Sequence, residues 1–363
     1  MYYHAPADIP NFPPIIRRSK VAKRGTARYF PGYMLPPIPR TEKRLEVQTF
    51  YHFVTLSAED VARVKKGLEV SANKFGISGL IILGQEGLNA TASGPSECLP
   101  LFLKESGSLL IPGFEFQNVK TSWIEPGEKI PFLEFVVKVR KEIVTLKRPD
   151  LLPHQPGSGT HISPEEWHAG IQAPEAVVID TRNNYESSIG TFRNALTPQI
   201  EEFSDFPSWL DLNVKDKSKP TYIFCTGGIR CEKAIVAMEE KGFSNVKQLD
   251  GGILNYIEKF PASKTTSMWD GECFVFDNRI AVDGDGRASK KFSACPHCGQ
   301  PADHSIFCVR CDSPAVLCDD CYNEKAIEQA ETCSKNCAHH WSVAPGKKGN
   351  PQTLTWAPAS ATK

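Results

Sequence analysis

The segment TYIFCTGGIRCEKAIVAMEE, residues 221–240, places the tightest constraint on what this chain folds into. Its first four residues predict a short buried strand, and the apolar residues of its second half recur at helical spacing. Cys225 therefore stands at the end of a strand, and residues 226–230 form a loop before a helix. Because loop N–H groups and a helix N-terminus stabilise an anion, we expect the Cys225 thiol to have a lowered pKa and to act as a nucleophile.

Strand and helix patterns alternate on both sides of this segment, which predicts an α/β domain with a parallel sheet. The expected strands are 176–180, 221–225 and 245–252, and the expected helices are 207–213, 231–242 and 253–260. Ligands bind at the carboxyl ends of parallel strands, so Asp180 and Cys225 are expected at the same edge of the sheet.

The loop after Cys225 fits sulfur chemistry better than phosphate chemistry. Four residues separate Cys225 from Arg230, whereas a cysteine phosphatase needs a longer loop to cradle a tetrahedral phosphate. The smaller loop suits a smaller occupant, such as the outer sulfur of a persulfide, although a buried inert cysteine is also open. Cys231 has two interpretations, a thiol that resolves an oxidised Cys225 through a disulfide or a small packed hydrophobe. The loop residues are Thr226, Gly227, Gly228, Ile229 and Cys231.

Eight of the 12 cysteines fall in four close pairs near the C-terminal end. Thiolates at these offsets reach tetrahedral zinc on tight turns, and eight ligands match two closed structural sites, with the pairs in sequential or interleaved order. Such clustering indicates metal rather than disulfides, and hence a reducing compartment. The isolated Cys98 and Cys273 are expected to be ordinary thiols. The predicted ligands are Cys295, Cys298, Cys308, Cys311, Cys318, Cys321, Cys333 and Cys337.

The region 45–150 has the pattern of a small α+β domain with the order β-α-β-β-α-β, which fits a ferredoxin-like fold. A capping box from Ser57 to Asp60 starts its first helix, and Gly76 ends it. The expected strands are 45–56, 77–84, 87–93 and 132–146, and the second helix is 96–106. The last strand is expected to carry three basic residues on a free sheet face, either as a solvated surface or as an RNA contact. These residues are Lys138, Arg140 and Lys147.

Composition excludes little about partners, because the formal net charge is zero. Residues 1–44 are Pro-rich and carry nine Lys or Arg against Asp8 and Glu42. They read as a disordered arm, with a nucleic-acid contact or an organelle transit peptide as alternatives. Without an apolar run of about 18 residues or an apolar signal region, we expect no membrane partner and a cytoplasmic protein. The sequence predicts no oligomeric state.

Several motifs together resemble one known family. The stretches VVIDTRNNYESSIGTFRNA, FCTGGIRC and QLDGGI resemble the strand, active loop and closing glycines of a rhodanese domain. With GTHISPEEWH before it, MWDGECFVFDNRIAV after it, a ferredoxin-like domain and a Cys-rich end, the chain resembles the rhodanese-related tRNA uridine hydroxylases over residues 45 to 340. Residues 1–44 extend beyond the usual bacterial start of that family.

The resemblance implies oxygen-dependent 5-hydroxylation of the wobble uridine in tRNA, with O2 as co-substrate. It implies that Cys225 is the active-site cysteine, that Arg230 closes its loop, and that Asp180 and Arg182 form an acidic–basic pair at the neighbouring strand end. That pair is either a structural salt bridge or, through Arg182, a substrate contact. As a hypothesis of our own, a Cys225 thiolate adds to C6 of uridine and makes C5 enolate-like and open to an oxygen donor. In the alternative, the loop N–H groups and Arg230 stabilise an oxidised sulfur species. No flavin, haem or iron motif is evident.

Two other functions remain open. The first is a sulfurtransferase, similar to thiosulfate sulfurtransferases, that passes persulfide sulfur from a donor to an acceptor thiol or tRNA. The second is a zinc-based RNA- or protein-binding adaptor with a vestigial rhodanese domain. The expected architecture is multidomain, α+β and α/β. Its parts are a basic arm (1–44), a ferredoxin-like domain (45–150), a rhodanese domain with a parallel sheet (160–262), a connecting segment (263–292), a Cys-rich zinc module (293–340) and a tail (341–363).

Overall fold

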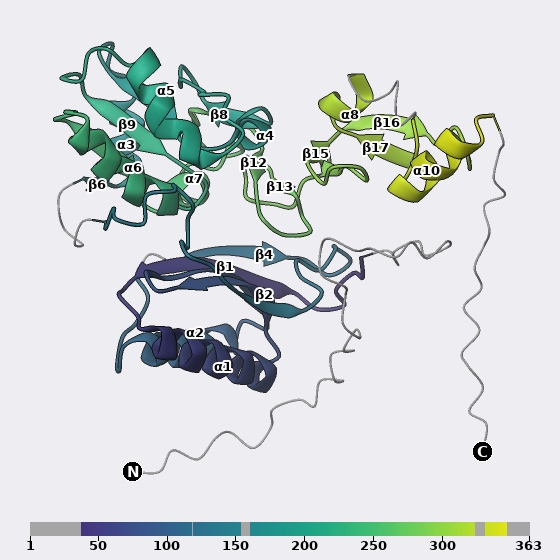
Figure 1. Cartoon of the computed structure of the whole chain (residues 1–363), viewed down its shortest axis with the longest axis horizontal. Coiled ribbons are helices and arrows are strands. Elements are labelled where there is room, and N and C mark those ends of the chain that lie inside the picture. Colours follow the sequence, from purple (N-terminus) through teal and green to yellow (C-terminus); the bar gives the residue numbers. More distant parts are fainter. Residues whose placement is uncertain (1–37, 118, 154–159, 324–330, 347–363) are drawn as a thin grey trace. The chain divides into compact units, whose positions relative to one another are not determined.

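The computed structural model describes residues 38–117, 119–153, 160–323 and 331–346 (Figure 1). These residues form two compact units, of which the first runs to Ala288 and the second begins at Ser289. The basic arm up to residue 37 and the tail from residue 347 lie outside the described residues. Within the described part of the chain, no helix is both long and apolar enough to cross a membrane.

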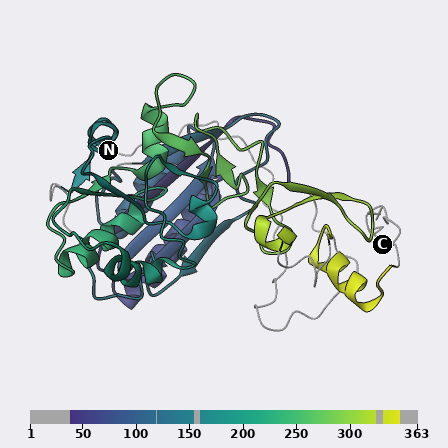
Figure 2. The same ribbon diagram turned by 90° about the horizontal axis from the view of Figure 1, so that it is seen from above.

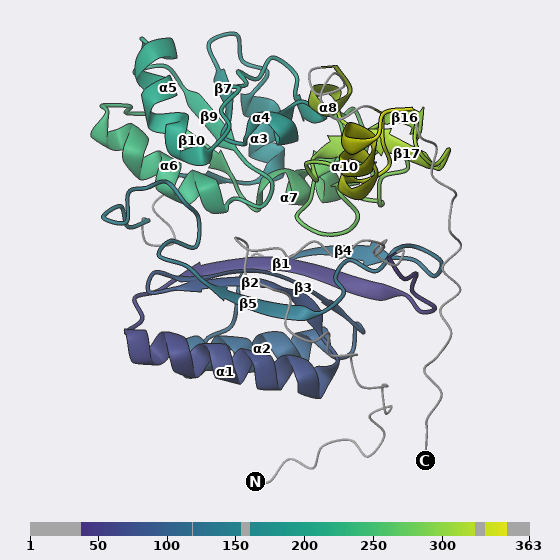
Figure 3. The same cartoon turned by 45° about the vertical axis from the view of Figure 1, so that its right-hand side comes forward.

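The first unit opens with a five-stranded sheet of order β4-β1-β3-β2-β5. Its first four strands pair in antiparallel fashion in the ferredoxin-like order, and β5 is added parallel to β2. Helices α1 and α2 cover one face of the sheet (Figure 3). The elements are β1 (Leu45–Phe53), α1 (Ala58–Phe75), β2 (Ser78–Gly84), β3 (Gly87–Gly94), α2 (Leu99–Leu110), β4 (Lys120–Ile124) and β5 (Phe135–Val139).

The first helix forms where the sequence predicts it. The capping box between Ser57 and Asp60 is present, and Gly76 ends α1 in the left-handed region with φ 65°. Between these caps, the predicted apolar stripe is buried, with Val64 and Leu68 fully inaccessible in the core between the helices and the sheet. The local signals and the tertiary packing agree here, which is why the prediction is confirmed.

The predicted final strand 132–146 is wrong in length and in place. The strand β5 keeps only five of those residues, and the fourth ferredoxin-like strand is instead β4, which the sequence analysis missed. Strand β4 has the sequence KTSWI, too short and polar to show an apolar run. The apolar residues Ile143 and Leu146 are buried, but as part of an irregular segment after β5. The alternation of apolar residues therefore predicted which positions are buried, but it did not predict which residues pair as a strand.

This correction moves the three basic residues. Lys138 lies on β5 and is exposed, and Arg140 is an exposed residue just after that strand. Lys147 lies off the sheet with φ 58°, and its ammonium pairs with Glu202 at 2.8 Å. The three residues therefore do not share one strand.

The rest of the first unit is the predicted α/β domain. Its sheet has the order β6-β10-β9-β7 and every pairing is parallel, as expected. Two additional two-stranded sheets pair β8 with β11 and β12 with β13. The strands β11, β12 and β13 belong to the segment after residue 262. The elements are β6 (His161–Ile162), α3 (Pro164–Gly170), β7 (Val177–Asp180), α4 (Asn184–Ser187), β8 (Gly190–Phe192), α5 (Phe206–Asn213), β9 (Thr221–Phe224), α6 (Ile229–Glu240), β10 (Val246–Leu249), α7 (Gly252–Lys259), β11 (Trp269–Gly271), β12 (Cys273–Phe274) and β13 (Ala281–Val282).

A buried ion triad joins the two domains of the first unit. Lys233 of α6 is completely buried, and its Nζ lies 2.8 Å from a carboxylate oxygen of Glu86 and 2.8 Å from one of Glu142. Both carboxylates belong to the N-terminal domain. The triad therefore joins α6 to the β2–β3 turn and to the segment after β5, and Figures 1 and 3 show the helix-free face of the sheet turned toward the α/β domain.

In its described residues, the second unit has two hairpins and two short helices, and Figure 2 shows it from above. Its apolar core is small, and cysteines make up half of its buried cluster, beside Ala302, Ile306 and Leu317. So few apolar contacts do not stabilise a fold of this size alone. The elements are β14 (Ser293–Ala294), β15 (Pro301–Ala302), β16 (His304–Phe307), β17 (Pro314–Leu317), α8 (Asp319–Asn323) and α10 (Lys335–Val343).

We predict that Lys233→Met destabilises the first unit by about 3–5 kcal/mol, because it leaves two buried carboxylates without their cation. Lys219→Met, the same change at an exposed position, should stay within about 0.5 kcal/mol of the parent. Urea unfolding measures both. Adding Glu86→Gln and Glu142→Gln to Lys233→Met should recover most of the loss, and a single variant as stable as the parent would contradict the triad's role.

Candidate active site

Cys225 lies directly after β9 at the carboxyl edge of the parallel sheet, with 1% of its surface exposed. The loop that follows turns at Gly228, which has φ 98° and is the N-cap of α6. The Gly228 N–H donates to Cys225 Sγ at 3.1 Å. The loop therefore curls its backbone donors around the sulfur atom, as the strand–loop–helix pattern predicted.

A second glycine turn closes the loop from the other side. The N–H groups of Ile253 and Leu254 donate to the carbonyl oxygens of Cys225 and Thr226 at 3.0 and 3.1 Å. Gly252 has φ 67°, and a Cβ there would lie 2.5 Å from the Cys225 carbonyl oxygen. Only glycine permits this approach, so the QLDGGI motif shapes the loop without contacting the sulfur.

The surroundings of Cys225 stabilise its thiolate. Burial opposes ionisation, but a hydrogen bond from Cys231, the charge of Arg230 and the N–H groups of Arg230 and Gly228 outweigh it and lower the Cys225 pKa to about 6. Burial and the adjacent thiolate raise the pKa of Cys231 well above its usual value. Cys231 therefore stays protonated and acts as a donor to Cys225.

Two buried ion pairs organise the arginines near the loop. Arg230 donates to both carboxylate oxygens of Glu186, at 2.6 and 3.0 Å, which fixes the guanidinium beside the loop. Arg182 and Asp180 are fully buried and paired at 2.6 Å, and Arg182 also donates to two backbone carbonyls. The guanidinium of Arg182 thus donates to acceptors within the protein. Arg230 is instead the arginine whose charge lowers the pKa of Cys225.

The N-terminal domain contributes side chains that the sequence analysis did not identify. On the helix-free face of β1, Thr49 approaches Gly227 and Tyr51 approaches Gly228, with 3.7 and 3.1 Å from a Cβ placed on each glycine. Tyr51 donates to Glu232, at the start of α6, at 2.7 Å. These contacts join segments far apart in the sequence, so no local motif announces them.

Lys120 of β4 is the most unusual of these residues, because it is a lysine with only 7% of its surface exposed. Its Nζ lies 4.8 Å from the centre of the Tyr51 ring. Burial lowers the Lys120 pKa to about 8, although the charges of Asp250, Cys225 and Glu232 partly offset the effect. Lys120 therefore places a cation in the electrostatic neighbourhood of the Cys225 thiolate.

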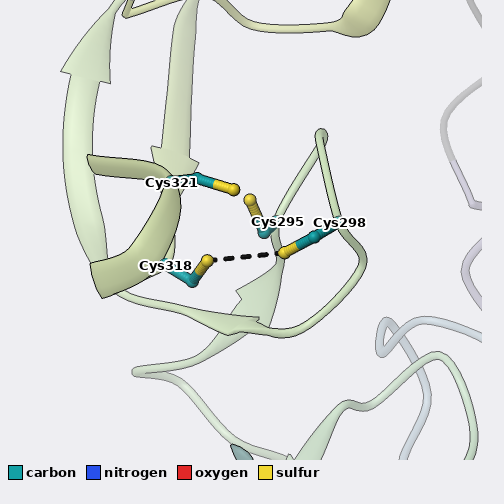
Figure 4. A group of neighbouring side chains, drawn as sticks. All are labelled: Cys295, Cys298, Cys318 and Cys321. Atoms are coloured by element: carbon teal, nitrogen blue, oxygen red, sulfur yellow. Dashed lines mark hydrogen bonds between the residues drawn. The ribbon is translucent and has the colours of Figure 1, made fainter. Parts of the chain in front are cut away.

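In the second unit, the eight predicted cysteine ligands form two groups of four. The groups interleave along the chain. One joins the first and third cysteine pairs and is drawn in Figure 4, and the other joins the second and fourth pairs. Four sulfur–sulfur separations within these groups lie between 3.4 and 3.8 Å. Four sulfurs at about 2.3 Å from a tetrahedral zinc are about 3.8 Å apart, so the geometry fits that metal. The groups are Cys295, Cys298, Cys318 and Cys321, and Cys308, Cys311, Cys333 and Cys337.

All 12 cysteines are free thiols, in line with the expectation of metal sites rather than disulfides. Cys98 is partly buried at the start of α2, and Cys273 is fully buried on β12. Burial raises the pKa of Cys273 to about 12, so it is not a second nucleophile.

Three family models match the chain. An acylphosphatase-like domain model matches residues 45–143, a rhodanese-like domain model matches residues 163–259, and a rhodanese C-terminal model matches residues 270–338. The fold and the Cys225 loop thus define a rhodanese-like protein with an additional N-terminal domain. A solved rhodanese-like domain from Anabaena sp. is 16% identical, covering 31% of this chain and 79% of its own, with a TM-score of 0.27. Because that score is low, the finer assignment rests on sequence relatives.

Curated relatives resolve the family. A tRNA uridine(34) hydroxylase of Bdellovibrio bacteriovorus is 42% identical over 316 residues, which cover 85% of each chain. Proteins of the same name from Synechocystis sp. and Legionella pneumophila are 40% and 42% identical, covering 70% and 66% of this chain and 88% and 91% of theirs. The chain belongs to the tRNA uridine(34) hydroxylase family.

We predict that the Cys225 thiolate titrates with a midpoint at pH about 6. Cys231→Ala should move this midpoint to higher pH, because the hydrogen bond that favours the thiolate is removed. The measurement is the ultraviolet absorbance of the thiolate against pH, as a difference from Cys225→Ser so that metal-bound thiolates cancel. Cys98→Ala is the matched control and should leave the midpoint in place. A parent midpoint at the value of an ordinary thiol would refute this account of the loop.

Proposed function

We propose that this protein hydroxylates uridine 34 of tRNA at C5, with Cys225 as the nucleophile. The observation that carries the proposal is a thiolate-stabilising loop in a chain whose curated relatives are named tRNA uridine(34) hydroxylases. Arg230, held by Glu186, stabilises negative charge at the loop. Asp180 and Arg182 support the strand end as a structural pair.

In the proposed chemistry, Cys225 Sγ adds to C6 of the uracil and the electrons of the C5–C6 double bond move to C5 and the adjacent carbonyl oxygen. C5 then carries enolate character and accepts an oxygen atom. Loss of the C5 proton and expulsion of the thiolate from C6 restore the double bond. Molecular oxygen supplies the inserted atom as co-substrate, and two electrons and two protons from a thiol-class reductant convert its second atom to water.

The tRNA also needs contacts outside the loop. We assign phosphate contacts to the exposed basic residues of the N-terminal domain, first Lys138 and Arg140 at the β5 edge, and more weakly Lys147, which is already paired with Glu202. Phosphate contacts weaken with salt and do not discriminate sequence, so charge reversal at Lys138 and Arg140 should flatten the salt dependence of tRNA binding.

We predict that Cys225→Ser abolishes the modification and leaves the fold intact, because a serine hydroxyl is not ionised at neutral pH. Mass analysis of tRNA nucleosides from cells that carry the parent, the variant or no gene measures this. Loss of 5-hydroxyuridine derivatives supports the hydroxylase. Loss of a thiolated base instead identifies the sulfurtransferase, which the same low-pKa thiolate also suits. Full modification by Cys225→Ser rules out covalent catalysis. If the tRNA nucleosides are the same in all three kinds of cell, the adaptor is favoured.

We further propose that each interleaved group of four cysteines holds one zinc ion in a closed structural site. The chemistry of the donors carries this proposal, since four thiolates at these separations leave no open position for a substrate. Metal bonds then stabilise the second unit, whose apolar core is small.

We predict two zinc ions per chain, and a pair of double variants tests the pairing. Cys298→Ala with Cys318→Ala changes one interleaved group and should remove one zinc, whereas Cys298→Ala with Cys308→Ala changes both and should remove two. Native mass spectrometry counts the metal. Sequential pairing gives the opposite pattern, and stoichiometric iron in the parent excludes the zinc assignment.

A further inference from the structure

A polar cavity lies beside the Cys225 loop, between the N-terminal and rhodanese domains of the first unit. It has a volume of about 230 Å³ and is lined by the start of β4 on one side and by residues from the N-cap to the last residue of α7 on the other. The lining residues are Val119, Lys120, Gly251, Asn255, Glu258 and Lys259. Ligand pockets for drug-sized molecules measure about 300–1,000 Å³, so this one suits a small group such as a single nucleotide's phosphate.

The cavity adjoins the reactive loop. Gly251 lines it and is followed by Gly252, which packs against the carbonyl oxygen of Cys225. From the other domain, the Tyr51 hydroxyl reaches Gly228, and Lys120 lies over the Tyr51 ring. Through Gly251 and Lys120, the cavity lining is thus joined to residues that contact the Cys225 loop.

Lys120 is the feature that indicates a ligand. Only 7% of its surface is exposed, and the contact recorded for its Nζ among the described residues is the Tyr51 ring, 4.8 Å away. Because Nζ is not among the inaccessible unpartnered atoms and Lys120 lines the cavity, this ammonium group in a largely buried place is open to an anion there. Glu258 and Lys259 also line the cavity, and both are exposed, so they add one charge of each sign. An anionic oxygen in the cavity satisfies Lys120.

We propose that Lys120 binds a phosphate of the RNA backbone next to the reacting uridine, so that the N-terminal domain completes the active site of the rhodanese domain. Lys120 is then a positioning residue, because it holds the nucleotide while Cys225 reacts. The inference rests on the proposed function for the identity of the RNA, but its test measures binding and not modification.

The test uses a synthetic anticodon stem-loop RNA with uridine at position 34 and measures its dissociation constant at several salt concentrations. Lys120→Met should weaken binding about 10-fold, the scale of one charged hydrogen bond, and lower the salt slope by roughly one. Lys120→Arg should retain most of the affinity. Lys104→Met, on the exposed side of α2 across the sheet, is the matched control and should change neither quantity.

A second RNA locates the contact. Replacing one phosphate that flanks uridine 34 by an uncharged methylphosphonate should weaken binding to the parent but not to Lys120→Met, because the contact is already lost. Equal losses in both proteins at each flanking phosphate overturn the proposal. So does a folded Lys120→Met protein with parental affinity, even if its Cys225 titration shifts. If the parent binds RNA through Lys120 and yet modifies no uridine, the hydroxylase proposal fails and this one stands.

Discussion

The contact between Lys233 and the carboxylates of Glu86 and Glu142 is the interaction on which the rest of the first unit depends. Three buried charges from separate segments are tolerated only when all three meet, so the triad accepts one docking geometry. Because Lys233 lies on α6, whose N-terminus ends the active loop, that geometry also sets what faces Cys225. The helix-free face of the five-stranded sheet, which carries Thr49, Tyr51 and Lys120, becomes one wall of the site.

Within this frame, Cys225 holds a negative charge in a buried place. The cost of burial is offset by backbone donors, by the Cys231 thiol and by Arg230, which Glu186 in turn keeps in position. Each partner comes from a different element, yet all converge on one sulfur atom. With 1% of its surface exposed, Cys225 is stabilised as a thiolate and shielded from solvent at the same time.

Much of this could be predicted locally. The Ser57 capping box, Gly76, the parallel strands and the loop from Cys225 to Arg230 follow from residue order, because caps, turns and buried strands depend on neighbours a few positions apart. The long final strand was wrong for the same reason. Alternating apolar residues predict burial, but strand β4 was chosen by pairing with β1 across the sheet, which its polar sequence does not signal.

The sequence by itself determined the parallel α/β domain, the position of Cys225 at a strand end before its loop and the presence of eight closely paired cysteines. Only the tertiary structure decided how those thiols are shared, because Cys298 lies nearer in the chain to Cys308 but in space to Cys318. It also decided that Lys120 belongs beside the active loop. Side-chain types and short spacings are properties of the chain, whereas the meeting of distant residues depends on which surfaces exclude water together, and no local pattern encodes that.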